Sequence, residues 1–101
     1  MTCIGIVAHG RSISVAATAS SVGSTSLNMA DANSLHIANT SATLYACVRW
    51  GTGAQTAVLG QDLTIPPMGQ VIVGAGPQIT GVAAIGSGAG PTAVVFTPCR
   101  T

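Results

Sequence analysis

Few residues of this chain have side chains that can perform acid–base or nucleophilic chemistry. His36, Asp62 and one of the many Ser residues together have the residue types of a hydrolytic triad, in which a base activates a hydroxyl nucleophile. The sequence contains no Gly-x-Ser-x-Gly turn, the element that presents the nucleophile in one large class of hydrolases. Both acids, Asp31 and Asp62, fall in segments rich in turn residues, where Asp bonds nearby backbone groups. Because acid–base catalysis needs several converging titratable groups, we expect that the protein is not an enzyme.

Metal ligands are equally sparse. His9 and His36 stand apart from each other and from any cluster of acidic or thiol side chains. Cys3, Cys47 and Cys99 are too widely spaced to match a zinc motif such as Cys-x-x-Cys. We therefore expect no metal, no other cofactor and three reduced cysteines that are buried as small apolar residues. A disulfide between Cys3 and Cys99 is the alternative that an oxidising compartment would permit.

Two glycine-rich segments, GAGPQITG and GSGAG, have the composition of phosphate-binding loops. Neither is followed by a helical pattern or by Lys and then Ser or Thr, which a phosphate loop requires. Turn formation accounts for both segments, so we expect no small-molecule substrate.

Composition argues against two further classes of partner. Charged residues make up 5% of the chain, against about 25% in a typical globular protein. The three basic residues, Arg11, Arg49 and Arg100, do not form the basic patch that nucleic-acid binding needs. Although 48% of the residues are hydrophobic, no apolar run approaches the roughly 20 residues of a membrane-spanning helix. We expect neither nucleic acid nor membrane as a partner.

The elements that must position these residues are β-strands. Apolar and other residues alternate with a period of two along 12–18, 34–40 and 44–50, which is typical of strands. Shorter apolar segments at 62–65, 70–73, 80–85 and 92–96 are separated by Gly and Pro. About eight short strands at this spacing predict an all-β fold, a single antiparallel β-sandwich over 1–101 that is jelly-roll-like.

The N-terminal third is the least regular part of the pattern. Ile4, Ile6 and Ala8 predict a first strand, because the start lacks the basic region and the continuous apolar region of a secretory signal. The segment 19–33 has two interpretations. It forms a strand that includes Val22, Leu27 and Met29, or it is a loop or arm.

The segment 44–50 contains the only Trp and the only Tyr, and is predicted to be a central strand. Leu44, Ala46, Val48 and Trp50 share one face, and Thr43, Tyr45, Cys47 and Arg49 share the other. The first face is uniformly apolar, so it should point into the core and Tyr45 and Arg49 should point outward. The residues that we expect in the core are Trp50, Val48, Leu44, Ile37 and Phe96.

The scarcity of charge also predicts association with other protein subunits. A soluble monomer is normally dispersed by a charged surface without apolar patches, and five charged side chains supply little of this. Arg and Tyr are enriched in interfaces, so Tyr45, Arg49, Arg11 and Arg100 are the candidate interface residues. We expect a trimer or another homo-oligomer, and strand edges that no Lys protects.

Three segments resemble small virion proteins of tailed bacteriophages: LHIANTSATLYACVRWGTG, IPPMGQVIV and VAAIGSGAGPTAVVFTPC. The resemblance covers roughly residues 34–99. It implies a capsid decoration or cement protein that bridges subunits of the major capsid protein on the virion surface and is assembled in the bacterial cytoplasm. The alternative that it implies is a head–tail connector or tail component. A carbohydrate-binding sandwich would need an aromatic platform, for which Trp50, Tyr45 and Phe96 are the only rings.

Overall fold

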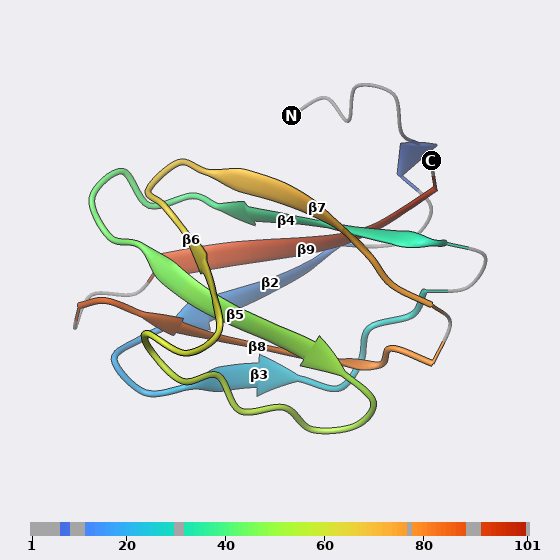
Figure 1. The fold of residues 1–101 in the computed structure, drawn as a ribbon, viewed down its shortest axis with the longest axis horizontal. Helices are drawn as coiled ribbons and strands as arrows, with labels where there is room; N and C mark the ends of the chain where they lie inside the picture. Colours follow the sequence, from blue (N-terminus) through green and yellow to red (C-terminus); the bar gives the residue numbers. More distant parts are fainter. Residues whose placement is uncertain (1–6, 9–11, 30–31, 77, 89–91, 101) are drawn as a thin grey trace.

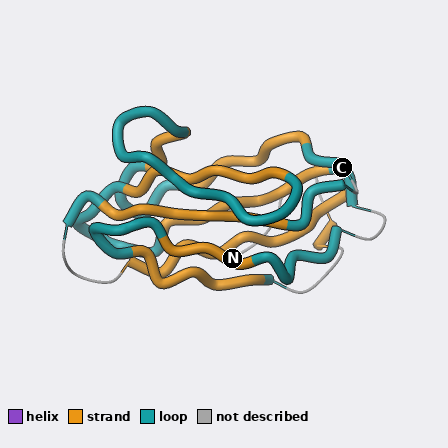
Figure 2. Tube along the Cα trace, turned by 90° about the horizontal axis from the view of Figure 1, so that it is seen from below, coloured by secondary structure: helices purple, strands orange, loops and turns teal. Residues whose placement is uncertain are grey.

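The computed structural model describes residues 7–8, 12–29, 32–76, 78–88 and 92–100. Over these residues the chain forms nine β-strands and no helix (Figure 1). In chain order the strands are β1 (Val7–Ala8), β2 (Ile13–Ala17), β3 (Val22–Ser24), β4 (Ser34–Asn39), β5 (Ala46–Gly51), β6 (Leu63–Ile65), β7 (Gln70–Gly74), β8 (Gly81–Gly86) and β9 (Thr92–Arg100). They run along the long axis of the molecule, and most connecting loops gather at its two ends (Figure 2).

The strands pair as one long hairpin that is folded back on itself. β2 pairs with β9, β3 with β8, β4 with β7 and β5 with β6, each time antiparallel. β4 also pairs with β9, and β5 with β8. The result is a five-stranded sheet of β1, β2, β9, β4 and β7, called sheet A here, and a four-stranded sheet of β3, β8, β5 and β6, called sheet B. This nested order is that of a jelly roll, so the predicted all-β antiparallel sandwich is confirmed.

Both β1 and β2 lie along the same edge of β9. The register shifts by two residues between them, because Val7 is opposite Arg100 whereas Ile13 is opposite Phe96. They are therefore two pieces of one interrupted edge strand. Of the predicted first strand, Ile4 and Ile6 lie outside the described residues.

Alternation along the central strands builds the core between the two sheets. Leu35 and Ile37 of β4 are fully buried, and Ile37 lies opposite Phe96 of β9. Phe96 is the largest fully buried side chain among the described residues. Val48 of sheet B is 1% exposed and belongs to the same hydrophobic core cluster. Three of the predicted core residues, Ile37, Val48 and Phe96, thus lie in the interior.

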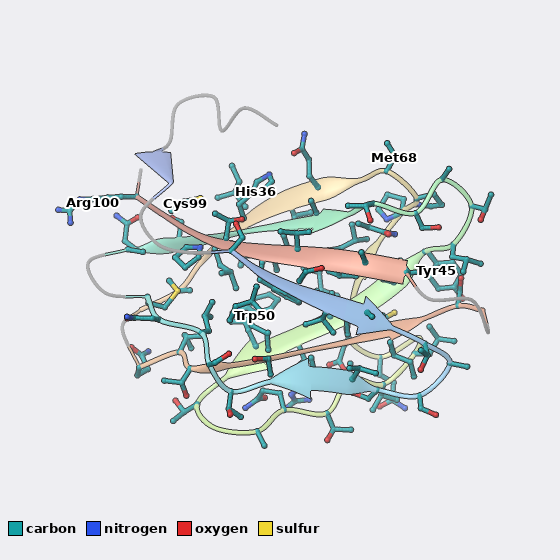
Figure 3. All side chains as sticks on the ribbon, turned by 180° about the vertical axis from the view of Figure 1, so that it is seen from behind. His36, Tyr45, Trp50, Met68, Cys99 and Arg100 are labelled. Carbon is teal, nitrogen blue, oxygen red and sulfur yellow. The ribbon has the colours of Figure 1, made fainter. Side chains whose placement is uncertain are left out.

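The other two predicted core residues, Trp50 and Leu44, lie at the margin of the core. Trp50 is partly buried and packs against the core cluster from the end of β5, between the two sheets (Figure 3). Leu44 is not part of the cluster, because β5 begins only at Ala46 and Leu44 precedes it in a turn. Its side chain packs toward Gly88, where an added Cβ would lie 2.9 Å from Leu44 Cδ2. The expectation that Leu44 is a core residue was therefore wrong.

The segment 19–33 contains one short strand and a loop that packs onto the sandwich. β3 pairs with β8 over three residues. Beyond it, Leu27 and Met29 are 4% and 1% exposed and belong to the core cluster. Leu27 N donates to Thr80 O at 3.3 Å, so this loop is not a detached arm.

A tight turn joins β6 of sheet B to β7 of sheet A. Gly69 N donates to Pro66 O at 2.9 Å, and Met68 N donates to Ser41 O at 2.8 Å. Met68 has a φ of 59°, in the left-handed region that favours glycine. Such a conformation costs an L-residue on the order of 1 kcal/mol, yet the Met68 side chain is 69% exposed.

A buried amide holds the same end of the sandwich together. The Nδ2 group of Asn39, a residue that is only 2% exposed, donates to the carbonyl of Leu44 at 2.9 Å and to those of Ile65 and Pro66 at 3.2 Å. Its Oδ1 accepts from Ser41 N at 3.0 Å. The end of β4 is thereby tied to the turns on both sides of it, so the start of β7 has a defined position.

The different depths of Phe96 and Trp50 give a stability prediction. Phe96→Ala should lower the free energy of unfolding by about 3–5 kcal/mol, because it leaves a cavity in the closed core. Trp50→Ala should cost clearly less, because part of the indole is already in contact with water. Urea unfolding of both variants measures the order, and a larger loss for Trp50→Ala would contradict this description of the core.

Candidate interaction surface

His36 and Asp62, the two described residues with catalytic potential, lie on opposite faces of the sandwich; His9 and Asp31 lie outside the described residues. His36 points outward from sheet A, is 5% exposed, and its Nε2 forms a hydrogen bond with Gln70 Oε1 at 2.9 Å (Figure 3). Asp62 precedes β6 and is paired with Arg49 at the outer face of sheet B. The core separates His36 from Asp62, so these two side chains form no catalytic dyad.

The described part of the chain contains no group of three His, Cys, Asp or Glu residues that could hold a metal. His9, Cys3 and Arg11 lie outside the described residues. Shallow hollows among the described residues include one of about 400 Å³ lined by Gly23, Ser24, Thr25, Ala54 and Gln55, and one of about 250 Å³ lined by Val48, Arg49, Trp50, Asp62 and Leu63. Ligand pockets are typically clefts of about 300–1,000 Å³ with apolar and aromatic linings. The first hollow lacks such a lining and the second is smaller.

The outer face of sheet B is covered by the chain itself. Residues 52–62, called the strap here, leave β5, pass β3 and return to β6 (Figure 1). Ala57 N donates to Ser21 Oγ at 2.9 Å beside β3, and Gly60 N donates to Cys47 Sγ at 3.5 Å over β5. Cys47 and Ala83 point outward from the sheet but are fully buried beneath the strap. The predicted burial of Cys47 therefore depends on the strap, not on the core.

Arg49 holds the strap at two points. Its Nη1 lies 3.5 Å from Asp62 Oδ1, and its Nε donates to Gln55 Oε1 at 3.3 Å. Asp62 Oδ2 also accepts a hydrogen bond from Val58 N at 2.7 Å, which closes the turn at the end of the strap. The side chain of Arg49 is 55% exposed, so its role in an interface stays a prediction beside this internal role, which the sequence did not indicate.

The three predicted interface residues that the structure describes do not form one patch. Tyr45 is 41% exposed just before β5, and Arg100 is exposed at the end of β9. Figure 3 places these two side chains at opposite ends of the molecule. Arg49 and Tyr45 are both on the sheet B side, and the buried Cys47 lies between them.

On the outer face of sheet A no described segment forms a strap, yet the outward residues of β4 have little contact with solvent, since Ser34, His36 and Ala38 are 7%, 5% and 4% exposed. His36 lies beside Ile72 and Thr97, and Ala38 lies beside Gln70 and Val95. The outward residues are Ser12, Ser14, Ala16, Ser34, His36, Ala38, Gln70, Ile72, Gly74, Ala93, Val95, Thr97 and the buried Cys99. None of them is Asp, Glu, Lys or Arg. Alternation identified the outward positions of 12–18 and 34–40, but not that these positions form one face.

Comparisons with protein-family models, with curated proteins and with solved structures gave no match. Over the residues that the structure describes, no helix is long and apolar enough to cross a membrane. The function of the surface is therefore inferred from its geometry and composition.

The strap gives a prediction that labelling can test. Asp62→Ala removes both the acceptor of Val58 N and the partner of Arg49. The free energy needed to open the strap should therefore fall by about 1 kcal/mol. The thiol of Cys47 should then react roughly fivefold faster with a thiol reagent, as followed by peptide-resolved mass spectrometry. Arg49→Ala leaves the hydrogen bond from Val58 N to Asp62 in place and should change the rate less, because exposed ion pairs contribute little. An unchanged rate in Asp62→Ala would show that the strap does not protect Cys47.

Proposed function

We propose that this protein is a structural virion component, a capsid decoration or cement protein that bridges subunits of the major capsid protein on the outside of a tailed-phage head. The observation that carries the proposal is the uncharged outer face of sheet A, which lies opposite a face that the chain's own strap already covers. The sequence resemblance and the jelly-roll fold, which is common in viral capsid domains, support it. Fold alone does not assign a function.

The chemistry of the face suits permanent burial against protein. Burying a charged side chain is costly unless a partner of opposite charge is supplied. Ser, Thr, Ala, Val and Ile side chains carry no such cost, and their hydroxyls can form bonds within the face, as those of Ser12 and Thr97 do at 2.7 Å. A coat subunit could therefore cover this face with few matched charges.

The proposed mechanism is clamping by many weak contacts. Each copy would contact two or more coat subunits, so opening the shell would require several interfaces to break together. The runner-up function is a head–tail connector or tail component. Copy number separates the two, because a decoration protein occurs in hundreds of copies per particle and a connector in about a dozen.

The proposal predicts that particles lacking the protein rupture at a lower temperature, and that added protein restores their stability. Ala16→Glu in the outer face of sheet A should abolish this rescue, because Ala16 is exposed and faces Ala93 across β2 and β9. Ala54→Glu adds the same charge to the strap side and should still rescue. Rupture is followed by release of a DNA-binding dye during heating.

Three results would contradict this proposal. The first is particles that are equally stable without the protein, and the second is a dozen or fewer copies per particle by gel densitometry. The third is rescue by Ala16→Glu at the level of the unmodified protein, which would exclude the outer face of sheet A as the contact.

A further inference from the structure

Strand β7 is an edge of sheet A whose outward backbone groups can be identified. Gly69 O accepts from Asn39 N at 2.9 Å, and Ala75 N donates to Asn33 O at 3.1 Å, at the two ends of the β4–β7 ladder. In an antiparallel pair the bonded positions alternate, so Val71 and Val73 also bond to β4. The N–H and C=O groups of Gln70, Ile72 and Gly74 therefore point away from β4. Among the described residues no other strand pairs with β7.

The side chains of this edge strand are uncharged, and Gln70 is its only polar side chain. Natural edge strands usually avoid pairing by being short or by carrying Lys, Pro or a bulge. β7 has five residues with no charge and no Pro, whereas the edge strands of sheet B, β3 and β6, have three residues each. Ile72 is 48% exposed, and Leu63 of neighbouring β6 is 40% exposed. The opposite edge of sheet A, β2, exposes only Ser14 and Ala16.

Met68 adds a second, independent observation at the same edge. Its backbone is in a conformation that suits glycine, while its side chain is 69% exposed and contributes no core contact that would account for it. Local strain of this kind concentrates at functional positions. Figure 3 shows Met68 projecting from the turn that leads into β7.

We propose that β7 pairs antiparallel with β7 of a second copy of this chain, about a two-fold axis at Ile72. In this register Ile72 faces Ile72 of the second copy and exchanges two backbone hydrogen bonds with it. Gln70 faces Gly74, and the pairing ends there because β7 spans only Gln70–Gly74 and Met68 lies in the preceding turn. The outward groups of Gln70, Ile72 and Gly74 on both copies are then paired.

The edge fits a second copy because it is complementary to itself in this register. The longer side chain of Gln70 meets a glycine, and the half-exposed Ile72 side chains cover each other. Because no residue of β7 is charged, no like charges meet at the axis. Isologous two-fold contacts of this kind are the commonest in homo-oligomers. The proposal concerns the isolated protein and does not depend on the proposed role in a phage head.

Analytical ultracentrifugation of the full chain tests the pairing, at up to roughly 0.5 mM because small interfaces are weak. The unmodified protein should have the mass of two chains. Ile72→Lys places two positive charges beside the axis and should give one chain. Ile72→Pro should do the same, because it removes an N–H that points away from β4 and leaves the β4 ladder intact. Val22→Lys, an exposed apolar residue on edge strand β3, is the matched control and should keep two chains.

The melting temperature of each variant shows whether it is folded. If either Ile72 variant unfolds, Met68→Gly replaces it, since glycine suits the left-handed backbone of this turn and the exposed side chain is lost only from the edge. Met68→Gly should keep or raise the melting temperature and weaken the dimer. A one-chain mass for the unmodified protein, a two-chain mass for folded Ile72 variants, or dissociation by Val22→Lys would each overturn the proposal.

Discussion

Backbone hydrogen bonds between strands hold the two sheets of this protein together, and charged side chains add little, because the sequence has only three Arg and two Asp. The nested ladders from β2·β9 to β5·β6 satisfy the backbone of the interior strands and close two sheets over a core of mostly small side chains. Where other proteins cover the remaining surface with Lys and Glu, this chain has neither residue. Among the described residues a loop covers the outer face of sheet B only, and at the outer face of sheet A the strands that flank β4 keep exposed residues such as Ala16, Ile72 and Ala93.

The two faces of the sandwich differ for this reason. On sheet B the strap lies over Cys47 and Ala83, and the pair of Arg49 and Asp62 holds its end. On sheet A the hydroxyl and small apolar side chains have no such segment above them among the described residues. The proposed shell contact at this face and the proposed β7 pairing are compatible in space. A two-fold axis perpendicular to sheet A keeps the outer faces of both copies on one side, so pairing would double the area of a single uncharged face.

The sequence predicted the parts of the structure that depend on neighbouring residues, and missed the parts that depend on contacts distant in sequence. Period-two alternation depends only on neighbouring residues, so it located most strands and placed Ile37, Val48 and Phe96 on inward positions. It also wrongly placed the start of the central strand at Leu44. The alternation begins there, but the backbone pairing of β5 begins only at Ala46. It could not show that the outward Cys47 is buried or that Arg49 bonds to Gln55 and Asp62, because a loop crossing a sheet depends on contacts distant in sequence. The left-handed backbone of Met68 was not predicted, because residues other than Gly, Asn and Asp rarely adopt it.

The central claim is that protein, not water, covers the uncharged surface of this chain, and site-resolved amide exchange in the assembled state tests it most directly. The N–H groups of Gln70, Ile72 and Gly74 point away from β4, whereas those of Val71 and Val73 bond to it and serve as internal references. If the claim is right, the Ile72 amide exchanges quickly in dilute protein and becomes as protected as Val71 and Val73 when the protein is concentrated. An Ile72 amide that exchanges equally fast at every concentration would contradict it.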